Sequence, residues 1–336
     1  MYKAYAAMSA GAQLEKVERE EADLGPGQVE IDVSYCGICH SDLSMIDNDW
    51  GMSAYPLVAG HEVIGKVSRV GGAVDSSFIG KTVGLGWQSG YCGSCKSCHS
   101  ADENLCASAK GTIVGRDGGF ADKVVADFSS VVEIPDGMDL AKIGPLLCGG
   151  ITVYNPLVQF DVKPTDRVAV IGIGGLGHLG LQFLNAWGCH VTAFTSSDSK
   201  RDEALKLGAH DTLNSSDPKA LEDAANRFDF IISTVNVKLD WNAYVGTLAP
   251  KGRLHFVGAT TEPLDLAVFP LLLGQKSVSA SPVGSPSTIR QMLEFAKLHD
   301  IAPQVEMFDM SDINDAMQHL KDGKARYRIV LDNTKS

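Results

Sequence analysis

The sequence predicts an α/β protein with two domains, a β-rich domain and a doubly wound parallel sheet. Three observations carry that prediction. Short alternating runs separated by Gly- and Pro-containing turns fill residues 1 to about 143, as in a barrel-like all-β domain. From about residue 145, strand-like and helix-like runs alternate, which is the pattern of a parallel sheet covered by helices. A glycine-rich turn follows the first of these later strands and leads into a helix.

The individual elements are expected in this order. The β-rich region has candidate strands at 29–33, 63–70, 82–85, 124–125 and 131–134. The second region has them at 168–171, 190–194, 230–234, 254–258 and 277–280, with a helix at 199–207. Beyond Pro282, two amphipathic helices at 287–299 and 311–321 precede a last strand at 328–331. The chain shows no repeat of 20–50 residues and no low-complexity segment.

The glycine-rich turn indicates a dinucleotide-binding site. A buried strand at 167–171 is followed by a G-x-G-G-x-G run and an amphipathic helix; the run comprises Gly172, Gly174, Gly175, Leu176 and Gly177. Glycine is needed there for the tight turn, for the approach of a pyrophosphate and for helix–strand packing. The helix N-terminus supplies free N–H groups for the phosphates. The alternative is an ordinary glycine turn, but the strand–turn–helix–strand context favours a dinucleotide.

Composition excludes several classes of protein. At 336 residues the chain can form two full cores, and its net charge of −12 argues against a nucleic-acid partner. No apolar run approaches the length of a membrane span, and the N-terminus reads directly as a strand without a signal peptide. We therefore expect a cytoplasmic protein. Eight cysteines in such a chain indicate metal or thiol chemistry rather than a disulfide framework.

One group of cysteines has the spacing of a closed metal site. The spacing C-x2-C-x2-C-x7-C is formed by Cys92, Cys95, Cys98 and Cys106. Four thiolates can close a tetrahedron around one zinc and leave no position open, so the site would be structural and would hold a loop that has little apolar material. The alternatives are an iron–sulfur site or two disulfides. Nothing else in the sequence suggests electron transfer, and structural zinc is the favoured interpretation.

Further motifs connect the chain to a known family. They are the run Tyr35 to Asp42 (Y-C-G-I-C-H-S-D), Tyr55-Pro56, Gly60-His61-Glu62, Cys148 to Thr152, and Gly323 to Arg328 (G-K-A-R-Y-R). With the four-cysteine loop and the glycine turn, they resemble the zinc-containing medium-chain alcohol dehydrogenases along essentially the whole chain. Within that superfamily the chain looks most like the cinnamyl alcohol dehydrogenase group of NADP-dependent aldehyde reductases. The resemblance implies a GroES-like catalytic domain over 1–147 and 284–336 and a Rossmann domain over 148–283.

The resemblance also implies a second, catalytic zinc. Its implied ligands are Cys39, His61 and Cys148, which leave a fourth position for water or a substrate oxygen. In the family, the ligand is the cysteine followed by His or Arg and then Ser or Thr; this selects Cys39 over Cys36. Cys36 and Cys189 are then left as packed, inert thiols.

Other catalytic roles follow from the same resemblance. Glu62 matches the glutamate that approaches the metal during ligand exchange, and Asp42 matches the carboxylate that holds the ligand histidine. Ser41 matches the hydroxyl that gives a proton to the alkoxide. Many relatives carry a histidine three residues further on, where this chain has Ser44. The relay is therefore expected to end at the ribose and water.

The cofactor is expected to be NADP(H). An NAD enzyme places an acidic residue at the end of the second strand to bind the ribose 2′-OH. This chain instead has Thr195, Ser196 and Ser197 there, with no acid before Asp198, followed by Lys200 and Arg201. Neutral hydroxyls and a cation can bind a 2′-phosphate that a carboxylate would repel. The alternative is that Lys200 and Arg201 are simply solvent-exposed residues at the start of a helix. The resemblance adds three cofactor contacts, His40, Thr152 and Arg326.

The expected function is zinc-dependent, reversible reduction of aldehydes to primary alcohols by NADPH, with aromatic or medium-chain substrates such as benzaldehyde or cinnamaldehyde. Trp50 and Trp87 either line an apolar substrate pocket or simply pack in the protein interior.

One alternative function is that of a polyol dehydrogenase, which more usually has an acidic third zinc ligand and an acidic residue at the end of the second strand. The other is a non-enzymatic zinc- and nucleotide-binding redox sensor that uses Cys36 and Cys39. Besides the small-molecule substrate, the expected partner is another copy of the chain, in a homodimer or homotetramer.

Overall fold

The computed structural model describes residues 1–196, 200–260 and 262–335. The chain divides into two compact units, one formed by Met1–Ile151 with Val283–Ser336 and the other by Thr152–Pro282. The first unit therefore contains both chain ends, and the second is inserted between its two parts. Among the described residues, no helix has both the length and the apolar character needed to cross a bilayer.

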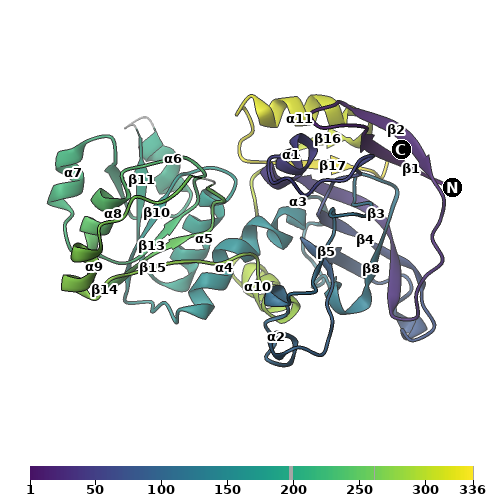
Figure 1. The fold of residues 1–336 in the computed structure, drawn as a ribbon, viewed down its shortest axis with the longest axis horizontal. Helices are drawn as coiled ribbons and strands as arrows, with labels where there is room; N and C mark the ends of the chain where they lie inside the picture. The colour runs from purple at the N-terminus through teal and green to yellow at the C-terminus, as the bar shows by residue number, and fades with distance from the viewer. Residues whose placement is uncertain (197–199, 261, 336) are drawn as a thin grey trace. The chain divides into compact units, whose positions relative to one another are not determined.

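A seven-stranded sheet forms the centre of the first unit (Figure 1). Its order is β16 (Val305–Asp309), β17 (Arg328–Asp332), β3 (Gln28–Ile38), β4 (Glu62–Val70), β5 (Thr82–Leu85) and β9 (Val132–Glu133), while β8 (Lys123–Asp127) pairs with β3. Two strand pairs accompany it, β1 (Tyr2–Ala7) with β2 (Leu14–Arg19) and β6 (Gln88–Gly90) with β7 (Lys110–Gly111). β17 lies antiparallel to β3 with Val330 opposite Gly37, so the end of the chain completes a sheet that begins near its start.

Within the described part of the chain, five α-helices belong wholly to the first unit: α1 (His40–Asp47), α2 (Lys96–His99), α3 (Leu140–Ile143), α10 (Pro286–Leu298) and α11 (Ile313–Lys321). The longest, α10, shows why they form. Ser285 caps its N-terminus by accepting the Thr288 N–H at 3.3 Å, and Pro286 occupies the first helical position. Ile289, Met292, Leu293 and Ala296 follow at helical spacing and are buried.

The second unit is a parallel six-stranded sheet. Its order is β12 (Asp211–Asn214), β11 (His190–Thr195), β10 (Arg167–Ile171), β13 (Phe228–Ser233), β14 (Leu248–Phe256) and β15 (Ser277–Ala280). Numbered along the chain, that order is 3-2-1-4-5-6, the doubly wound arrangement of dinucleotide-binding sheets. The crossover helices are α5 (Gly177–Trp187), α6 (Arg201–Lys206), α7 (Pro218–Asp223), α8 (Trp241–Thr247) and α9 (Val268–Gly274), and α4 (Gly149–Gln159) leads into the unit. The predicted fold class is confirmed.

The sequence did not predict every element of the second unit. β12 was missed because it is a short edge strand with only one buried residue, Leu213, and so shows little alternation. A helix was expected between β14 and β15, but α9 received no bounds because its sequence, V-F-P-L-L-L-G, is apolar on every side and contains Pro270, so it lacks the one-sided apolar pattern on which helix prediction depends. β14 begins at Leu248, whereas the predicted strand began at 254. The prediction began too late because the first half of β14 contains Pro250 and Gly252, which are not typical of a strand.

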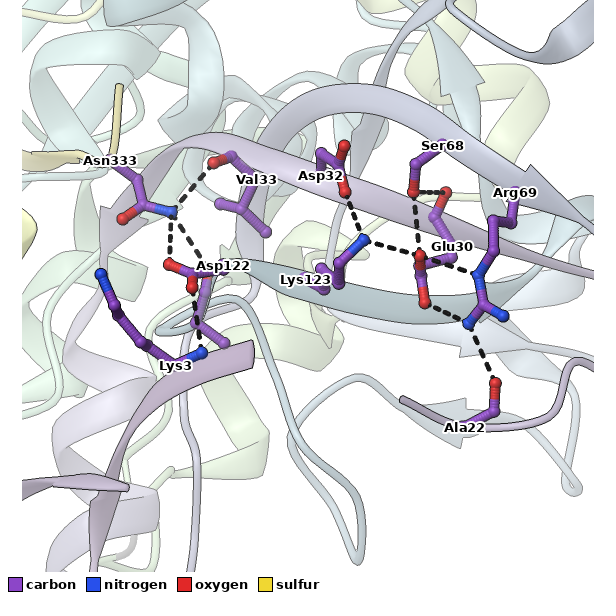
Figure 2. A network of polar contacts seen from close by, with 11 residues as sticks. Lys3, Ala22, Glu30, Asp32, Val33, Ser68, Arg69, Asp122, Lys123 and Asn333 are labelled. Atoms are coloured by element: carbon purple, nitrogen blue, oxygen red, sulfur yellow. Dashed lines mark hydrogen bonds and ion pairs between the residues drawn. The ribbon is translucent and has the colours of Figure 1, made fainter. Parts of the chain in front are cut away.

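A buried carboxylate ties three strands of the first unit together (Figure 2). Glu30 on β3 is 1% exposed and accepts hydrogen bonds from Ser68 and Arg69 on β4 and from Lys123 on β8, at 3.0, 3.0 and 2.9 Å to Oε1. Burial alone would raise the pKa of Glu30, but these donors, Arg69 foremost, lower it to about 2. The network therefore keeps a paired charge inside the sheet and fixes the register of β3 against both neighbours.

Candidate active site

Three donor atoms from separate segments meet inside the first unit. Cys39 lies between β3 and α1, His61 directly precedes β4, and Cys148 directly precedes α4; all three are buried. Cys39 Sγ lies 3.8 Å from Cys148 Sγ, and His61 Nε2 lies 3.3 Å from Cys148 Sγ. Ligand atoms about 2.0–2.3 Å from a tetrahedral zinc are roughly 3.3–3.8 Å apart. The donor chemistry and the spacing therefore fit a zinc ion.

Asp42 fixes the orientation of the His61 ring. This fully buried residue lies in the first turn of α1, where its Oδ2 accepts the Cys39 N–H at 2.9 Å. Its Oδ1 accepts the Gly60 N–H at 2.8 Å and lies 2.8 Å from His61 Nδ1. Burial alone would lower the pKa of His61, but the Asp42 carboxylate outweighs burial and raises it. With Nδ1 engaged, Nε2 is the nitrogen directed at the thiols.

The pKa values of the two thiols in the group shift in opposite directions. The hydrogen bond between Cys39 and Cys148 lowers the pKa of Cys39 and raises that of Cys148. Removing a second proton would place two thiolates side by side in a buried site, which is costly without a compensating cation. A divalent metal provides such compensation, so the electrostatics also fit a metal site.

Glu62 and Arg328 form a buried ion pair beside this group. A carboxylate oxygen of Glu62 lies within 4.8 Å of the other three donor atoms. Arg328 Nη2, at the start of β17, donates to Glu62 Oε1, while among the described residues Glu62 Oε2 and Arg328 Nε have no hydrogen-bond partner. Burial alone would lower the pKa of Arg328, but Glu62 and the two thiols raise it, so the guanidinium stays charged. A Cβ at Gly37 would lie 2.0 Å from Glu62 Oε2, which explains glycine there.

Arg328 was not predicted as a site residue. Arg326, two positions earlier, was predicted for a different role, as a contact of the cofactor, and that contact stays a prediction. Its side chain is exposed and, among the described residues, donates to the carbonyl oxygens of Gly323 and Ala325 in its own loop. The signal that could have found Arg328 is its place at the head of the apolar run Ile329 to Leu331, because a charge in a buried strand needs a partner.

Cys36 and Cys189 lie outside the donor group. Cys36 is fully buried within β3, its Sγ 3.6 Å from the Gly37 carbonyl oxygen, and burial raises the pKa of its thiol well above the usual range. Burial likewise raises the pKa of Cys189 to about 12, and its Sγ lies 3.3 Å from the Lys163 carbonyl oxygen. Both have the properties of unreactive packed thiols.

The four cysteines predicted to hold structural zinc lie together. Sγ–Sγ distances are 3.9 Å for Cys92–Cys98, 3.6 Å for Cys95–Cys98 and 3.5 Å for Cys92–Cys106. All eight cysteines are free, and these separations are far longer than the roughly 2.05 Å of a disulfide bond. They match the edges of a tetrahedron of sulfur atoms around zinc, about 3.8 Å long. The group is partly exposed and forms one loop around α2.

A hydroxyl and two aromatic rings lie close to the buried donor group. Ser41 Oγ lies 3.7 Å from Cys39 Sγ and is half-buried. The Trp87 ring meets the His61 ring edge to face with centroids 5.0 Å apart, and the Trp50 ring lies 5.9 Å from Trp87. Ser44, on the following turn of α1, is buried. The donor group therefore has a proton-carrying side chain and an apolar wall beside it.

In the second unit, the glycines of the turn have distinct roles. Gly172 adopts a positive φ of 86°, which other residues rarely accept, and a Cβ on Gly177 would lie 1.8 Å from the Gly172 carbonyl oxygen. A Cβ on Gly174 would meet nothing within 4 Å, so the middle of the turn is open. The turn ends at the N-terminus of α5, whose free N–H groups suit a phosphate.

The remaining predicted cofactor residues are distributed over both units. Thr195 is buried at the end of β11 and Ser196 is exposed next to it, while Ser197 lies outside the described residues. Lys200 and Arg201 are exposed at the start of α6, and Thr152 is buried in α4. His40, in the first unit, is exposed at the start of α1. Their contacts with a cofactor stay a prediction.

Comparison with known proteins identifies the family. Residues 25–136 match the model of the alcohol dehydrogenase GroES-like domain, and residues 175–297 match that of the zinc-binding dehydrogenases. The chain is 60% identical to the aldehyde reductase AdhA of Synechocystis over 100% of both chains. The chain belongs to the zinc-containing alcohol dehydrogenase family. The resemblance recognised in the sequence is therefore confirmed.

Solved structures of cinnamyl alcohol dehydrogenases from this family superpose closely. The Sorghum bicolor enzyme has a TM-score of 0.93 at 37% identity, covering 98% of this chain and 97% of its own. The Helicobacter pylori enzyme, solved with NADP(H), has a TM-score of 0.91 at 32% identity and covers 100% of this chain and 99% of its own. The chain is thus an alcohol dehydrogenase or aldehyde reductase of the zinc-containing family.

Proposed function

We propose that this alcohol dehydrogenase reversibly reduces aldehydes to primary alcohols with NADPH and a catalytic zinc. The observation that carries the proposal is the buried donor group of Cys39, His61 and Cys148. Because Glu62, the fourth donor nearby, is paired with Arg328, three protein ligands would hold the ion and the fourth position would take a substrate. The 60% identical aldehyde reductase supports the reaction class. The loop of Cys92, Cys95, Cys98 and Cys106 would hold a second, structural zinc.

Each residue around the donor group has a separate role in the proposed reaction. When bound, zinc supplies a Lewis acid for a carbonyl oxygen and NADPH supplies a hydride for the carbonyl carbon. Asp42 holds the His61 ring so that Nε2 faces the metal position. Arg328 holds the Glu62 carboxylate through Oε1. The other oxygen, Oε2, has no hydrogen-bond partner among the described residues, so it would be available to approach the metal position during ligand exchange. Ser41, 3.7 Å from Cys39 Sγ, would give its proton to the reduced oxygen.

A direct assay tests this assignment. Purified enzyme should contain two zinc ions per chain and should oxidise NADPH with benzaldehyde or cinnamaldehyde; removing the more labile zinc with a chelator should abolish turnover, and adding zinc should restore it. Zinc and NADPH binding without turnover of any aldehyde would instead favour a redox sensor. Faster NADP⁺ reduction with polyols than with primary alcohols would favour a polyol dehydrogenase.

Specificity for NADPH rests on the end of β11. Ser196 is exposed there, and Lys200 and Arg201 are exposed at the start of the next helix. Charge-assisted hydrogen bonds contribute about 1.5–3 kcal/mol each, so two of them, discounted for exposure, predict at least about a hundredfold preference for NADPH over NADH in kcat/KM. Ser196→Asp with Lys200→Ala should shrink or invert that ratio. Comparable rates of the parent enzyme with both cofactors would contradict the assignment.

The expected substrates are aromatic or medium-chain aldehydes. Trp87 and Trp50 provide a half-buried aromatic surface against His61, and aromatic substrates pack well against such edges. Trp87→Ala should therefore reduce kcat/KM for cinnamaldehyde more than for acetaldehyde. An equal loss for both aldehydes would assign the two tryptophans to packing alone.

The proposed assembly is a homodimer formed by the second unit. β15 is the edge strand of its sheet, and α9 exposes Val268, Phe269, Leu272 and Leu273 by 65%, 68%, 68% and 74%. An open edge beside a large apolar patch suits two-fold pairing with a second copy. Light scattering should give twice the chain mass, and Leu272→Glu with Leu273→Glu should give monomers. A monomeric parent would exclude the homodimer, and a mass of four chains would indicate the homotetramer.

A further inference from the structure

A buried threonine of the first unit holds both peptide groups that flank Trp87. Thr112 directly follows β7 and is fully buried. Its hydroxyl donates to the Gly86 carbonyl oxygen at 2.6 Å, and its backbone N–H donates to the Trp87 carbonyl oxygen at 2.8 Å. Among the described residues, no other group donates to the Gly86 carbonyl oxygen. One residue therefore fixes two successive peptide planes.

These two planes determine where the Trp87 side chain points. The peptide planes before and after a residue meet at its Cα, and their orientations define its φ and ψ angles and thus the direction of its side chain. Without the hydroxyl of Thr112, its N–H would still hold the second plane, but the first plane would be released. The Gly86 carbonyl is part of a buried residue, and a buried carbonyl without a donor is costly, so this plane would turn toward another partner.

The Gly86 peptide also lies against the segment that carries Cys148. A Cβ on Gly86 would lie 2.6 Å from the Leu147 carbonyl oxygen, which belongs to the peptide group that joins Leu147 to Cys148. Glycine is required there because a side chain would collide with that backbone. The residue before Trp87 is thus packed against the residue before a predicted metal ligand. A rotation of the Gly86 peptide would therefore move Trp87 relative to the donor group.

We propose that Thr112 is a positioning residue for the aromatic wall formed by Trp87 and Trp50, and that it sets the preference for aromatic aldehydes through this wall. The Trp87 ring meets the rings of His61 and Trp50 edge to face, with centroids 5.0 and 5.9 Å away. Such contacts need a defined ring orientation, which the two hydrogen bonds of Thr112 supply through the backbone. The inference rests on the proposed reduction of aromatic aldehydes and concerns the same site.

The isosteric variant Thr112→Val tests the hydroxyl, because it keeps the branched shape and the backbone N–H and removes only the donor to Gly86. In the zinc-loaded enzyme with NADPH, kcat/KM for cinnamaldehyde should fall about tenfold, the effect of one well-placed aromatic contact. The value for acetaldehyde, which has no ring to pack, should change less than about twofold. The zinc content should stay parental. Thr112→Ser, which keeps the hydroxyl, should retain most of the preference for cinnamaldehyde.

Two further measurements test whether Thr112 acts through Trp87. In the Trp87→Ala background, Thr112→Val should not change the ratio of the two kcat/KM values further, because the ring that it positions is absent. Near-ultraviolet circular dichroism reports the surroundings of tryptophan rings, and Trp50 and Trp87 are the tryptophans of the first unit. Thr112→Val should therefore alter part of the signal that Trp87→Ala removes.

A matched control is Thr247→Val. Thr247 belongs to the second unit, is also fully buried, and donates from its hydroxyl to the Tyr244 carbonyl oxygen at 2.8 Å. The substitution removes the same kind of buried hydrogen bond from the unit that lacks the donor group. It should leave the ratio of the two kcat/KM values within about twofold of the parental ratio. An equal change of that ratio would assign the effect to lost stability and would overturn the proposal.

Three other outcomes would also overturn it: a parental ratio in Thr112→Val, an equal change of the ratio in Thr112→Ser, or the full effect of Thr112→Val in the absence of the Trp87 ring. If Thr112→Val does not fold, as judged by far-ultraviolet circular dichroism and zinc content, Thr112→Ala replaces it with the same expectation. Failure of the proposed function looks different. In that case the parent would reduce neither aldehyde, or Trp87→Ala would lose both equally, and the near-ultraviolet signal would still show whether Thr112 holds the ring.

Discussion

The two cysteine groups of the first unit use similar ligand atoms in opposite settings. Cys92, Cys95, Cys98 and Cys106 come from one partly exposed loop and have a regular spacing. Cys39, His61 and Cys148 come from three segments spread over 109 positions and are at most 8% exposed. Four sulfurs fill a tetrahedron, whereas the buried group has three ligands beside an ion pair and a hydroxyl. A closed set is suited to holding a loop, and an open one to chemistry.

Burial determines what each group needs from its surroundings. Charges on the exposed loop are screened by solvent, so this group would need few partners beyond a bound metal. The buried group requires Asp42 on His61 and Arg328 on Glu62, because an unpaired charge there would be costly. Four predictions test this contrast, beginning with the largest expected effect.

Removing one ligand of the buried group should abolish activity and leave the fold intact. Cys148→Ala should reduce the zinc content from two ions to one per chain and lower kcat by about 10³-fold or more, since a Lewis acid contributes several kcal/mol to such a reaction. Metal analysis and steady-state kinetics measure both effects. Cys36→Ser is the matched control and should stay active with two zinc ions. If the Cys36→Ser variant were inactive and contained one zinc ion per chain, Cys36 rather than Cys39 would be the ligand.

Breaking the buried ion pair should mainly reduce stability. Arg328→Ala leaves Glu62 buried and unpaired and should lower the free energy of unfolding by about 3–5 kcal/mol, measured by denaturant titration without cofactor. The matched control is Arg326→Ala, because Arg326 is exposed and its side chain, among the described residues, hydrogen-bonds to the carbonyl oxygens of Gly323 and Ala325 in its own loop. It should change stability by less than about 0.5 kcal/mol. Equal losses in the two variants would mean that the Glu62 contact contributes nothing specific.

Removing the hydroxyl beside Cys39 should affect turnover without affecting the metal. Ser41→Ala should lower kcat by about 10²-fold, the usual effect of losing a positioned proton donor, and should retain both zinc ions. Ser41→Thr keeps the hydroxyl and should stay active, whereas Ser44→Ala, one turn along α1, should have little effect. Near-parental turnover in Ser41→Ala would indicate another route for the proton.

The exposed loop should show the smallest effect on catalysis. Cys106→Ser opens the closed set of ligands and should lower the melting temperature by roughly 5–10 °C with loss of one zinc. The kcat of the folded fraction should stay within about twofold of the parent, and Cys189→Ser should leave the melting temperature nearly unchanged. A normal melting temperature after loss of that zinc would argue against a structural role for the loop.

The sequence by itself determined the features that depend on near neighbours. The spacing of Cys92 to Cys106, the glycine turn between a strand and α5, and the alternation of strands and helices are each contained in a short window. The fold class could therefore be predicted, and it is confirmed. Choosing Cys39 over Cys36 already needed the resemblance to a family, because both cysteines occur in one C-x-x-C run.

Only the tertiary structure decided the contacts that join distant segments. Arg328 reaches Glu62 across 266 positions because β17 pairs with β3 in a register that sets Ile329 opposite Ile38. Thr234 reaches Ile171 because β13 is the neighbour of β10 in the sheet, although two strands intervene in the sequence. Strand order and register arise from burying apolar faces over the whole molecule, and a one-residue shift in register would send these side chains to the opposite face. No local pattern encodes such pairings.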